Sequence, residues 1–509
     1  MSGFVAIIGN DDRDACKKML AGIAHRGPDI WGTANMAPAV VGQNYLPADI
    51  GCPSEERPSV PLVSTQPAPR LMGYAGQIGN RPALCRELLV PEGPLQEERL
   101  LLALYSRFGT KMFDHLNDAI FAFIIVDENQ NVLAARDLLG IKTLFYAKQG
   151  QTIYLGSEIK SLLPVTDQVY EFPAGHYMDQ AGRFIPFASL PEQAPATRHE
   201  DPEACMAQVR HFITSSIEDR IDFFYPTGSL LSGGIDSSVI AMLASRRFKD
   251  KFGAQAQLPT FALGVGESQD IINARKVAQH IDSAHHELII DFDQILAALD
   301  TTIFFLESFD PSLVRSAVSN YLISKYASEQ GIEVLLSGEG GDEVFCGYMY
   351  LKQLPLAAQF KGQIDCLKFL HNNASLRLDH MNQCNQVRVV APLICGPLLD
   401  YALAMAPELK QKPEGDEKVE KWIFRKTFEN DLPKEVVWRL KAEFSQGSGS
   451  AGVLPNHFEQ VIDDSSFENA RQAFPLIRSK EEYYYFKIFT KHFGEGHAVK
   501  TVGQWITFR

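Results

Sequence analysis

The sequence predicts two folded units: an α+β unit of stacked antiparallel sheets, followed by an α/β unit around a parallel, doubly wound sheet. Three observations predict this division. The first ~190 of the 509 residues are rich in short apolar strands with the pattern of hairpins. A proline- and charge-rich stretch without apolar periodicity follows. Beyond it, apolar strands alternate with helical segments. We therefore place one domain at 1–190, a linker at 191–204 and a second domain at 205–509.

Hairpins and flanking helices define the first unit. Apolar runs predict strands at 4–9, 119–127, 131–137, 144–147 and 152–156, and we expect helices at 14–23 and 97–108. Such a mixture favours two sheets stacked on each other with the helices outside.

The second unit repeats strand and helix in turn. Strands are expected at 260–264, 286–290 and 332–336, and helices at 270–280, 292–308 and 314–330; the remainder is expected to be mostly helical. This rhythm predicts a parallel sheet, which binds ligands at the carboxyl ends of its strands.

Composition favours small-molecule substrates over nucleic acid. The chain has 62 acidic and 48 basic residues, a net charge of −14. No apolar stretch reaches the length of a transmembrane helix and the N-terminus lacks a basic signal-peptide region, so we expect a cytoplasmic protein without a membrane partner. The eight cysteines are scattered without a Cys-x-x-Cys pair, which argues against a disulfide framework or a zinc site.

The segment 232–238 (Ser-Gly-Gly-Ile-Asp-Ser-Ser) lies where a predicted strand turns into a helix. Its glycines and serines leave N–H and hydroxyl groups free to surround a phosphate, and Asp236 suits a magnesium–phosphate complex. The Gly-Lys-Ser/Thr of a Walker A loop is absent. The segment resembles the pyrophosphate-binding loop of the ATP pyrophosphatases; the alternative is a glycine-rich turn that binds no ligand.

Four motifs in one order extend this resemblance to nearly the whole chain. They are His-Arg-Gly-Pro-Asp at 25–29, the loop at 232–238, Ser-Gly-Glu-Gly-Gly-Asp-Glu at 337–343 and Arg-Leu-Lys-Ala-Glu-Phe-Ser at 439–445. Together they resemble the glutamine-dependent asparagine synthetases. The resemblance implies an Ntn-hydrolase-like αββα sandwich with a glutaminase site, then an ATP-pyrophosphatase domain of the adenine nucleotide α-hydrolase-like class.

The family activates a carboxylate as an acyl-adenylate, so the resemblance implies ATP and Mg²⁺ as cofactors. It implies that Asp236 and Asp342 bind magnesium. It also implies that Lys441 stabilises the transition state of adenylation; the alternative is that Lys441 is an ordinary surface lysine. Glu339 follows a predicted strand beside the expected magnesium ligand Asp342. We expect Glu339 to accept a proton from the attacking amine. The expected ATP and pyrophosphate contacts are Leu231, Ser232, Gly233, Gly234, Asp236, Ser237, Ser238, Leu263 and Gly338.

The glutaminase half departs from the family pattern. Ser2 stands where the family has its nucleophilic cysteine, and a hydroxyl lacks the accessible anion of a thiol. The Asn-Gly-Glu signature is replaced by Ala75, Gly76 and Gln77, and the segment 43–47 lacks the expected arginine. These changes predict an inactive glutaminase in which 25–29 is kept for structure.

The acceptor segment has changed as well. Ser312 and Leu313 replace a threonine pair of the family while Arg315 remains, and we assign all three to the substrate pocket. The run 390–395 begins with Val390 where the family has arginine. Because burying an unpaired carboxylate is costly, a pocket for free aspartate should not lose such contacts.

An enzyme that keeps the adenylation residues but has lost its glutaminase has no ammonia source of its own. We therefore expect the attacking amine to belong to the substrate itself. β-Lactam synthetases resemble this logic, although they have a tyrosine where this chain has Glu339. We therefore expect a β-lactam synthetase of antibiotic or toxin biosynthesis, acting on a small amino-acid-like molecule, with a homodimer as a possible assembly. One alternative is an amide ligase using free ammonia or a separate amine. The other is a non-catalytic relative, against which Asp236, Asp342 and Lys441 argue.

Overall fold

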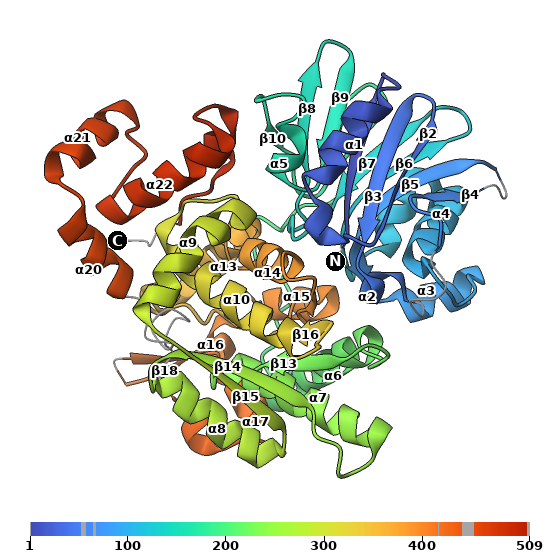
Figure 1. Ribbon diagram of the computed structural model, residues 1–509. Helices are drawn as coiled ribbons and strands as arrows, with labels where there is room; N and C mark the ends of the chain where they lie inside the picture. Colours follow the sequence, from blue (N-terminus) through green and yellow to red (C-terminus); the bar gives the residue numbers. More distant parts are fainter. Residues whose placement is uncertain (1, 52–57, 65–67, 416, 440–451, 506–509) are drawn as a thin grey trace.

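The computed structural model describes residues 2–51, 58–64, 68–415, 417–439 and 452–505. Figure 1 shows two lobes, one formed by the blue to cyan N-terminal elements and the other by the chain from green to red. Among the described residues, no helix is both long and apolar enough to cross a membrane.

The N-terminal lobe contains two antiparallel six-stranded sheets. The first has the order β10-β8-β9-β1-β3-β2 and the second the order β12-β11-β7-β6-β5-β4. The strands of the first sheet are β1 (Gly3–Ile8), β2 (Ile30–Met36), β3 (Ala39–Tyr45), β8 (Phe145–Gln149), β9 (Thr152–Gly156) and β10 (Tyr170–Glu171). Those of the second are β4 (Leu62–Ser64), β5 (Arg70–Ile78), β6 (Ala119–Asp127), β7 (Val132–Arg136), β11 (His176–Met178) and β12 (Phe184–Pro186).

Alternating side chains join these sheets into an αββα sandwich. On β1, Phe4 and Ala6 face a core shared with the second sheet, whereas Val5 and Ile7 face the helix α1 (Arg13–Ala21). Helices α3 (Arg81–Leu88) and α4 (Gln96–Phe108) cover the second sheet. The prediction of stacked antiparallel sheets with outer helices is confirmed. Short elements complete the lobe: α2 (Pro47–Ile50), α5 (Ile159–Leu162), η1 (Ala24–Arg26) and η2 (Gly109–His115).

The C-terminal lobe is built on a parallel sheet of order β15-β14-β13-β16-β17. Its strands are β13 (Thr227–Leu230), β14 (Pro259–Val265), β15 (Ala284–Ile290), β16 (Val334–Leu336) and β17 (Arg388–Val390). The strand order reverses between β13 and β16, so the doubly wound topology is confirmed and the loops after these two strands meet at its switch point.

Helices cover both faces of this sheet (Figure 1). Ala262 and Leu336 pack with α6 (Pro202–Arg220), α7 (Ile235–Phe252) and α8 (Gln269–Ile281). Phe261, Leu263 and Leu335 face the opposite way, toward α9 (Phe292–Leu306) and α10 (Pro311–Glu329). This alternation along β14 and β16 is the two-residue period of a strand buried on both sides.

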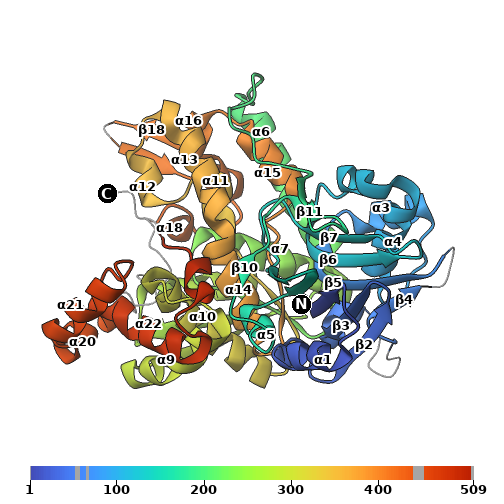
Figure 2. The same ribbon diagram turned by 90° about the horizontal axis from the view of Figure 1, so that it is seen from above.

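The rest of the lobe is largely helical, as expected, but it also contains β17 and the hairpin of β18 (Gln411–Glu414) and β19 (Glu417–Glu420), which the sequence reasoning missed. Its helices are α11 (Gly341–Phe345), α12 (Met349–Gln353), α13 (Leu356–Phe369), η3 (Leu370–Asn372), α14 (Ala374–Gln383), α15 (Gly396–Leu403), α16 (Pro407–Lys410), α17 (Trp422–Phe428), α18 (Lys434–Val437), α20 (Val453–Val461), α21 (Asp464–Ala473), α22 (Lys480–Phe493) and η4 (His497–Thr501). Figure 2 shows α20, α21 and α22, in red, at one end of the lobe.

The lobes share buried surface. One apolar cluster runs from Val5 and Met19 of the N-terminal lobe to Ile303, Leu313 and Leu376 of the C-terminal lobe. The packed side chains of this cluster therefore fix the position of the N-terminal lobe relative to the C-terminal lobe, in addition to the connecting segment.

Candidate active site

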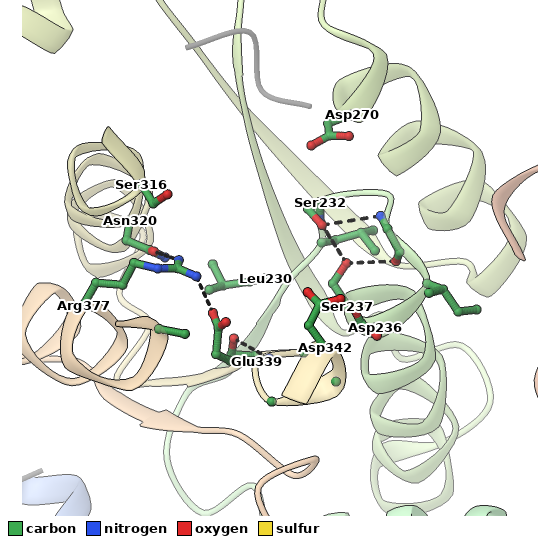
Figure 3. A pocket seen from close by; sticks show the side chains of 18 of the residues that line it. Leu230, Ser232, Asp236, Ser237, Asp270, Ser316, Asn320, Glu339, Asp342 and Arg377 are labelled. Atoms are coloured by element: carbon green, nitrogen blue, oxygen red, sulfur yellow. Dashed lines mark hydrogen bonds and ion pairs between the residues drawn. The ribbon is translucent and has the colours of Figure 1, made fainter. Parts of the chain in front are cut away.

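A cavity lies at the switch point, between the ends of β13 and β16 (Figure 3). Many of the residues proposed from the sequence line it together: Leu231, Ser232, Gly234, Asp236, Ser237, Leu263, Ser312, Gly338, Glu339 and Asp342. Segments more than 100 residues apart in the chain thus meet at the carboxyl edge of the sheet, where parallel α/β folds bind ligands.

The loop after β13 is arranged around its serines. The hydroxyl of Ser237 lies 3.0 Å from that of Ser232 and accepts the Ser232 N–H at 3.1 Å, while the Ser238 hydroxyl donates to the Gly234 carbonyl at 2.7 Å. Gly233 has a φ of +70°, and a Cβ there would lie 2.7 Å from the backbone nitrogen of Ala274. The turn therefore delivers the N-terminus of α7, with its unpaired N–H groups, to the cavity.

Gly338 allows the two loops to touch. A Cβ at this position would lie 2.4 Å from the backbone nitrogen of Ser237. Because only glycine permits this approach, the loop after β16 can place Glu339 and Asp342 directly opposite the loop after β13.

Two carboxylates that line the cavity share a buried lysine. The Lys421 ammonium lies 2.5 Å from Asp236 Oδ2 and 2.6 Å from Asp342 Oδ1, and its side chain is fully buried. The other oxygen of Asp236, Oδ1, is buried without a hydrogen-bond partner. Lys421 lies beyond the motifs that the sequence reasoning used and was missed.

These carboxylates fit a magnesium ion that is held jointly with a nucleotide. Mg²⁺ is commonly bound by one or two carboxylates together with substrate phosphates. Among the residues that the structure describes, no cluster of three or more His, Cys, Asp or Glu forms a dedicated metal cage. Asp236 and Asp342 would hold the ion, with the unpartnered Asp236 oxygen turned to it.

Arg439 packs against the loop after β13. Its guanidinium donates to the Gly233 carbonyl at 3.1 Å and to Asp270 at 2.7 Å. The proposed catalytic residue Lys441 follows two positions later and lies outside the described residues. The described part of the motif thus contacts the loop after β13, and the role of Lys441 stays a prediction.

Glu339 is held by a partner from another helix. Arg377 of α14 donates to Glu339 Oε2 at 2.8 Å and also contacts the side-chain oxygen of Asn320 in α10. Figure 3 shows the Arg377 guanidinium directed at the carboxylate of Glu339. Neither Arg377 nor Asn320 belongs to a motif, so sequence reasoning missed both.

The acceptor residues divide between cavity and core. The proposed substrate segment is the start of α10, so only one helical face, Ser312, Ser316 and Asn320, lines the cavity. Leu313 packs in the apolar core instead, and Arg315 donates to Glu481 at 3.2 Å. The prediction that Leu313 shapes the pocket is wrong, because a helix turns successive residues to different sides.

Val390 requires the same correction. It is the last residue of β17 and lies in the core between sheet and helices, outside the residues that line the cavity. The apolar acceptor pocket inferred from Leu313 and Val390 is therefore replaced by a face of α10 that presents Ser312, Ser316 and Asn320, followed by Ile323.

The residues at the expected glutaminase positions are buried. Ser2 is 2% exposed and donates to Asp49 at 3.0 Å, and Arg388 of the second lobe lies 3.7 Å from the other Asp49 oxygen. Ala75 and Gln77 are also buried. The serine hydroxyl is thus a hydrogen-bond donor inside the lobe interface.

Sequence comparisons agree with this architecture. A family model described as asparagine synthase matches residues 208–365 and 362–505, and one described as a glutamine amidotransferase domain matches 1–184. Asparagine synthetase (glutamine-hydrolyzing) from Gallus gallus is 30% identical over 544 residues, which cover 97% of this chain and 94% of the relative. Asparagine synthetase B (glutamine-hydrolyzing) from Escherichia coli K12 is 32% identical over 499 residues, covering 94% and 88%.

Proposed function

Because the chain belongs to the asparagine synthetase family of ATP-dependent amide-forming ligases, we propose that it activates a substrate carboxylate with ATP and then closes an intramolecular amide. The product of this reaction is a small lactam, with a β-lactam of an antibiotic or toxin pathway as the favoured form. AMP and pyrophosphate are the other products. The proposal places Ser232, Asp236 and Glu339 in the reaction.

The burial of Ser2 against Asp49 is the observation that supports the proposal. A glutaminase of this class needs an accessible nucleophile and groups that recognise glutamine. Here Ser2 is buried against Asp49, and Gln43 uses its side-chain amide to bridge Gly3, Asn44 and Tyr74. An enzyme that keeps adenylation groups but has no internal ammonia source is best served by an amine on the substrate.

Adenylation would use the groups that surround the two loops. The N–H groups at the start of α7 and the hydroxyls of Ser232 and Ser237 would bind the phosphates. Lys421 would keep the carboxylates of Asp236 and Asp342 in position beside these phosphates. Magnesium held by Asp236 and Asp342 would supply further positive charge at this point.

Amide formation would then depend on Glu339. An ammonium group cannot attack until it has lost a proton, and a carboxylate within hydrogen-bond reach can accept it. Arg377 holds Glu339 by one oxygen, Oε2, which leaves Oε1 for the substrate. Since amine and acyl group belong to one molecule, their proximity offsets the strain of a small ring.

One observation favours a second candidate, an amide ligase that uses free ammonia or a separate small amine. A second cavity lies between the lobes, lined by Gln77 on one side and by Gly340 and Glu343 on the other. It would allow an uncharged amine to approach the loop after β16 from the N-terminal lobe.

Mass spectrometry distinguishes these functions. The purified protein would be incubated with ATP, MgCl₂ and a panel containing L-aspartate, L-2,3-diaminopropionate, L-2,4-diaminobutyrate and L-ornithine, with and without ¹⁵N-ammonium. We expect one acid to lose a single water without ¹⁵N incorporation, together with AMP and pyrophosphate. Incorporation of ¹⁵N into an acyclic amide would replace the lactam proposal with the second candidate, and ADP plus phosphate would contradict both.

A further inference from the structure

A buried ion-pair cluster joins the two lobes behind the candidate active site. Its six members carry equal numbers of positive and negative charges. The N-terminal lobe supplies the three cations and one carboxylate, and the C-terminal lobe supplies the other two carboxylates. The cations are Arg26, Lys142 and Lys160, and the carboxylates are Glu158, Glu307 and Asp379. All six are buried. Such a cluster is costly to assemble and strongly destabilising to break, so each member fixes its neighbours in place.

Asp379 is one of the two carboxylates through which the cluster binds the C-terminal lobe. Arg26 donates to its Oδ2 at 2.6 Å, and Lys142 donates to its Oδ1 at 2.7 Å. Burial alone would raise the pKa of Asp379, but the charges of Arg26 and Lys142 outweigh it and hold the pKa below its ordinary value. Both oxygens of this carboxylate are therefore bound by the N-terminal lobe.

Asp379 lies on the same helix as the partner of Glu339. It follows Arg377 by two positions on α14, and residues two apart on a helix project to widely different sides. On one side, Asp379 meets the cluster. On the other, Arg377 reaches Glu339 and Asn320 in the cavity. The next residue, His380, adds a hydrogen bond of 2.8 Å to the Phe305 carbonyl.

We propose that the N-terminal lobe acts as a clamp on α14: Arg26 and Lys142 hold Asp379, and α14 thereby holds Arg377 against Glu339. Arg26, Lys142 and Asp379 are positioning residues. This gives the lobe a task in the synthetase reaction that does not require glutamine hydrolysis. The inference rests on the role proposed above for Glu339.

The clamp acts on one step of the reaction. The loop after β13 has its own hydrogen bonds and receives none from the cluster among the contacts described above. Loss of the clamp should therefore leave adenylation in place while the proton acceptor for amide formation is misplaced. A misplacement of about 1 Å can reduce a rate about 100-fold.

The test compares two isosteric variants of the full-length protein. Asp379→Asn keeps the side-chain shape but removes the charge that Arg26 and Lys142 share. Its matched control is Glu307→Gln, which removes another buried charge of the cluster. Glu307 is bound by Lys160 and by the N–H groups of residues 159 and 160, so its loss does not release Asp379.

Crystal structures of both variants give the first readout, which needs no substrate. We expect the 2.8 Å contact between Arg377 and Glu339 to be lost in Asp379→Asn and kept in Glu307→Gln. Retention of the contact in Asp379→Asn would overturn the clamp. If Asp379→Asn does not fold, Lys142→Met replaces it in the test. This variant keeps the Arg26–Asp379 pair, so we expect a smaller displacement of Arg377 from Glu339. An unchanged Arg377 position would again overturn the clamp.

The second readout is the ratio of amide formed to AMP released, measured with the acid from the panel that gives the strongest wild-type turnover. We expect this ratio to fall about 10- to 100-fold in Asp379→Asn and to stay near wild type in Glu307→Gln. An equal fall in both variants would mean general destabilisation and would refute the clamp. Because the ratio is defined for a lactam and for an acyclic amide alike, an unexpected product refutes the proposed function without affecting this test.

Discussion

The ammonium group of Lys421 lies 2.5 Å from the carboxylate of Asp236, at the end of a fully buried side chain. It contacts Asp342 as well, so one lysine bridges the two carboxylates at the switch point and offsets part of their charge. A Cβ at Gly347 would lie 2.0 Å from Lys421 Cε, which means that glycine is required there to admit the lysine. The two carboxylates of the cavity wall are thus held by a buried cation even without a nucleotide.

Lys421→Met should abolish adenylation. The substitution leaves the carboxylates of Asp236 and Asp342 close together without their shared cation, so their repulsion would displace them. Loss of one preorganised electrostatic partner reduces rates by about 10²–10³. ATP–pyrophosphate exchange with the active acid is the measurement. Lys418→Met, on the hairpin just before it, is the control and should retain exchange, because the Lys418 ammonium donates only to the carbonyls of Lys352 and Leu354 in the contacts seen.

Glutamine should not support turnover, and Ser2→Cys should not restore its hydrolysis. The site lacks more than the nucleophile, since Ala75 and Gln77 replace the residues of the recognition signature and Ser2 is buried against Asp49. The measurement is glutamate release from glutamine by the wild type and by the variant, with ammonium as the nitrogen source in a parallel reaction. Glutamate release by either protein above a heat-treated sample would contradict this prediction.

Sequence reasoning succeeded where a pattern was local and regular. The alternation of apolar strands and helices predicted the parallel sheet, and the glycine-rich motifs at 232–238 and 337–343 predicted two loops that do meet in one cavity. The three-residue strand β17 and the polar hairpin of β18 and β19 have too few apolar positions to show a period.

The residues that were missed depend on tertiary contacts. Lys421 and Arg377 lie outside any motif and reach the cavity only because distant elements fold around it. Leu313 was assigned to the pocket because of its place beside Ser312 in a motif. The start of α10 turns it into the core, so the error came from treating a helix as an extended loop.

Glu343 should make the protein less stable as the pH rises. Burial, with the nearby charges of Glu339 and Asp342, raises the pKa of Glu343 from 4.5 to about 7. The folded state therefore binds this proton more tightly than the unfolded state. The stability that it contributes is complete below pH 4.5 and is lost as the pH rises to about 7, by about 3 kcal/mol.

Glu343→Gln tests this pH dependence. Its amide oxygen can still accept the Tyr348 hydroxyl, which donates to Glu343 at 2.5 Å in the wild type. Urea unfolding between pH 5 and pH 8 should show the variant losing less stability than the wild type. Glu329→Gln, at an exposed glutamate on α10, is the control and should follow the wild type. A variant curve parallel to that of the wild type would show that Glu343 does not titrate in this range.

Glu339→Gln should separate the two half-reactions. Glutamine has nearly the same shape as glutamate and can still accept a hydrogen bond from Arg377, so the loop after β16 should keep its position. It cannot take a proton from the substrate ammonium, and the amine then remains unable to attack the acyl-adenylate. We expect ATP–pyrophosphate exchange within a few-fold of wild type, together with a loss of amide formation of about 10²–10⁴. Raising the pH should partly restore amide formation in the variant, because more of the substrate amine is then unprotonated before it binds. Arg377→Met is the companion variant: it leaves the carboxylate but releases its orientation, so amide formation should fall less than in Glu339→Gln and should not recover with pH in the same way. Full amide formation by Glu339→Gln at neutral pH would show that another group accepts the proton.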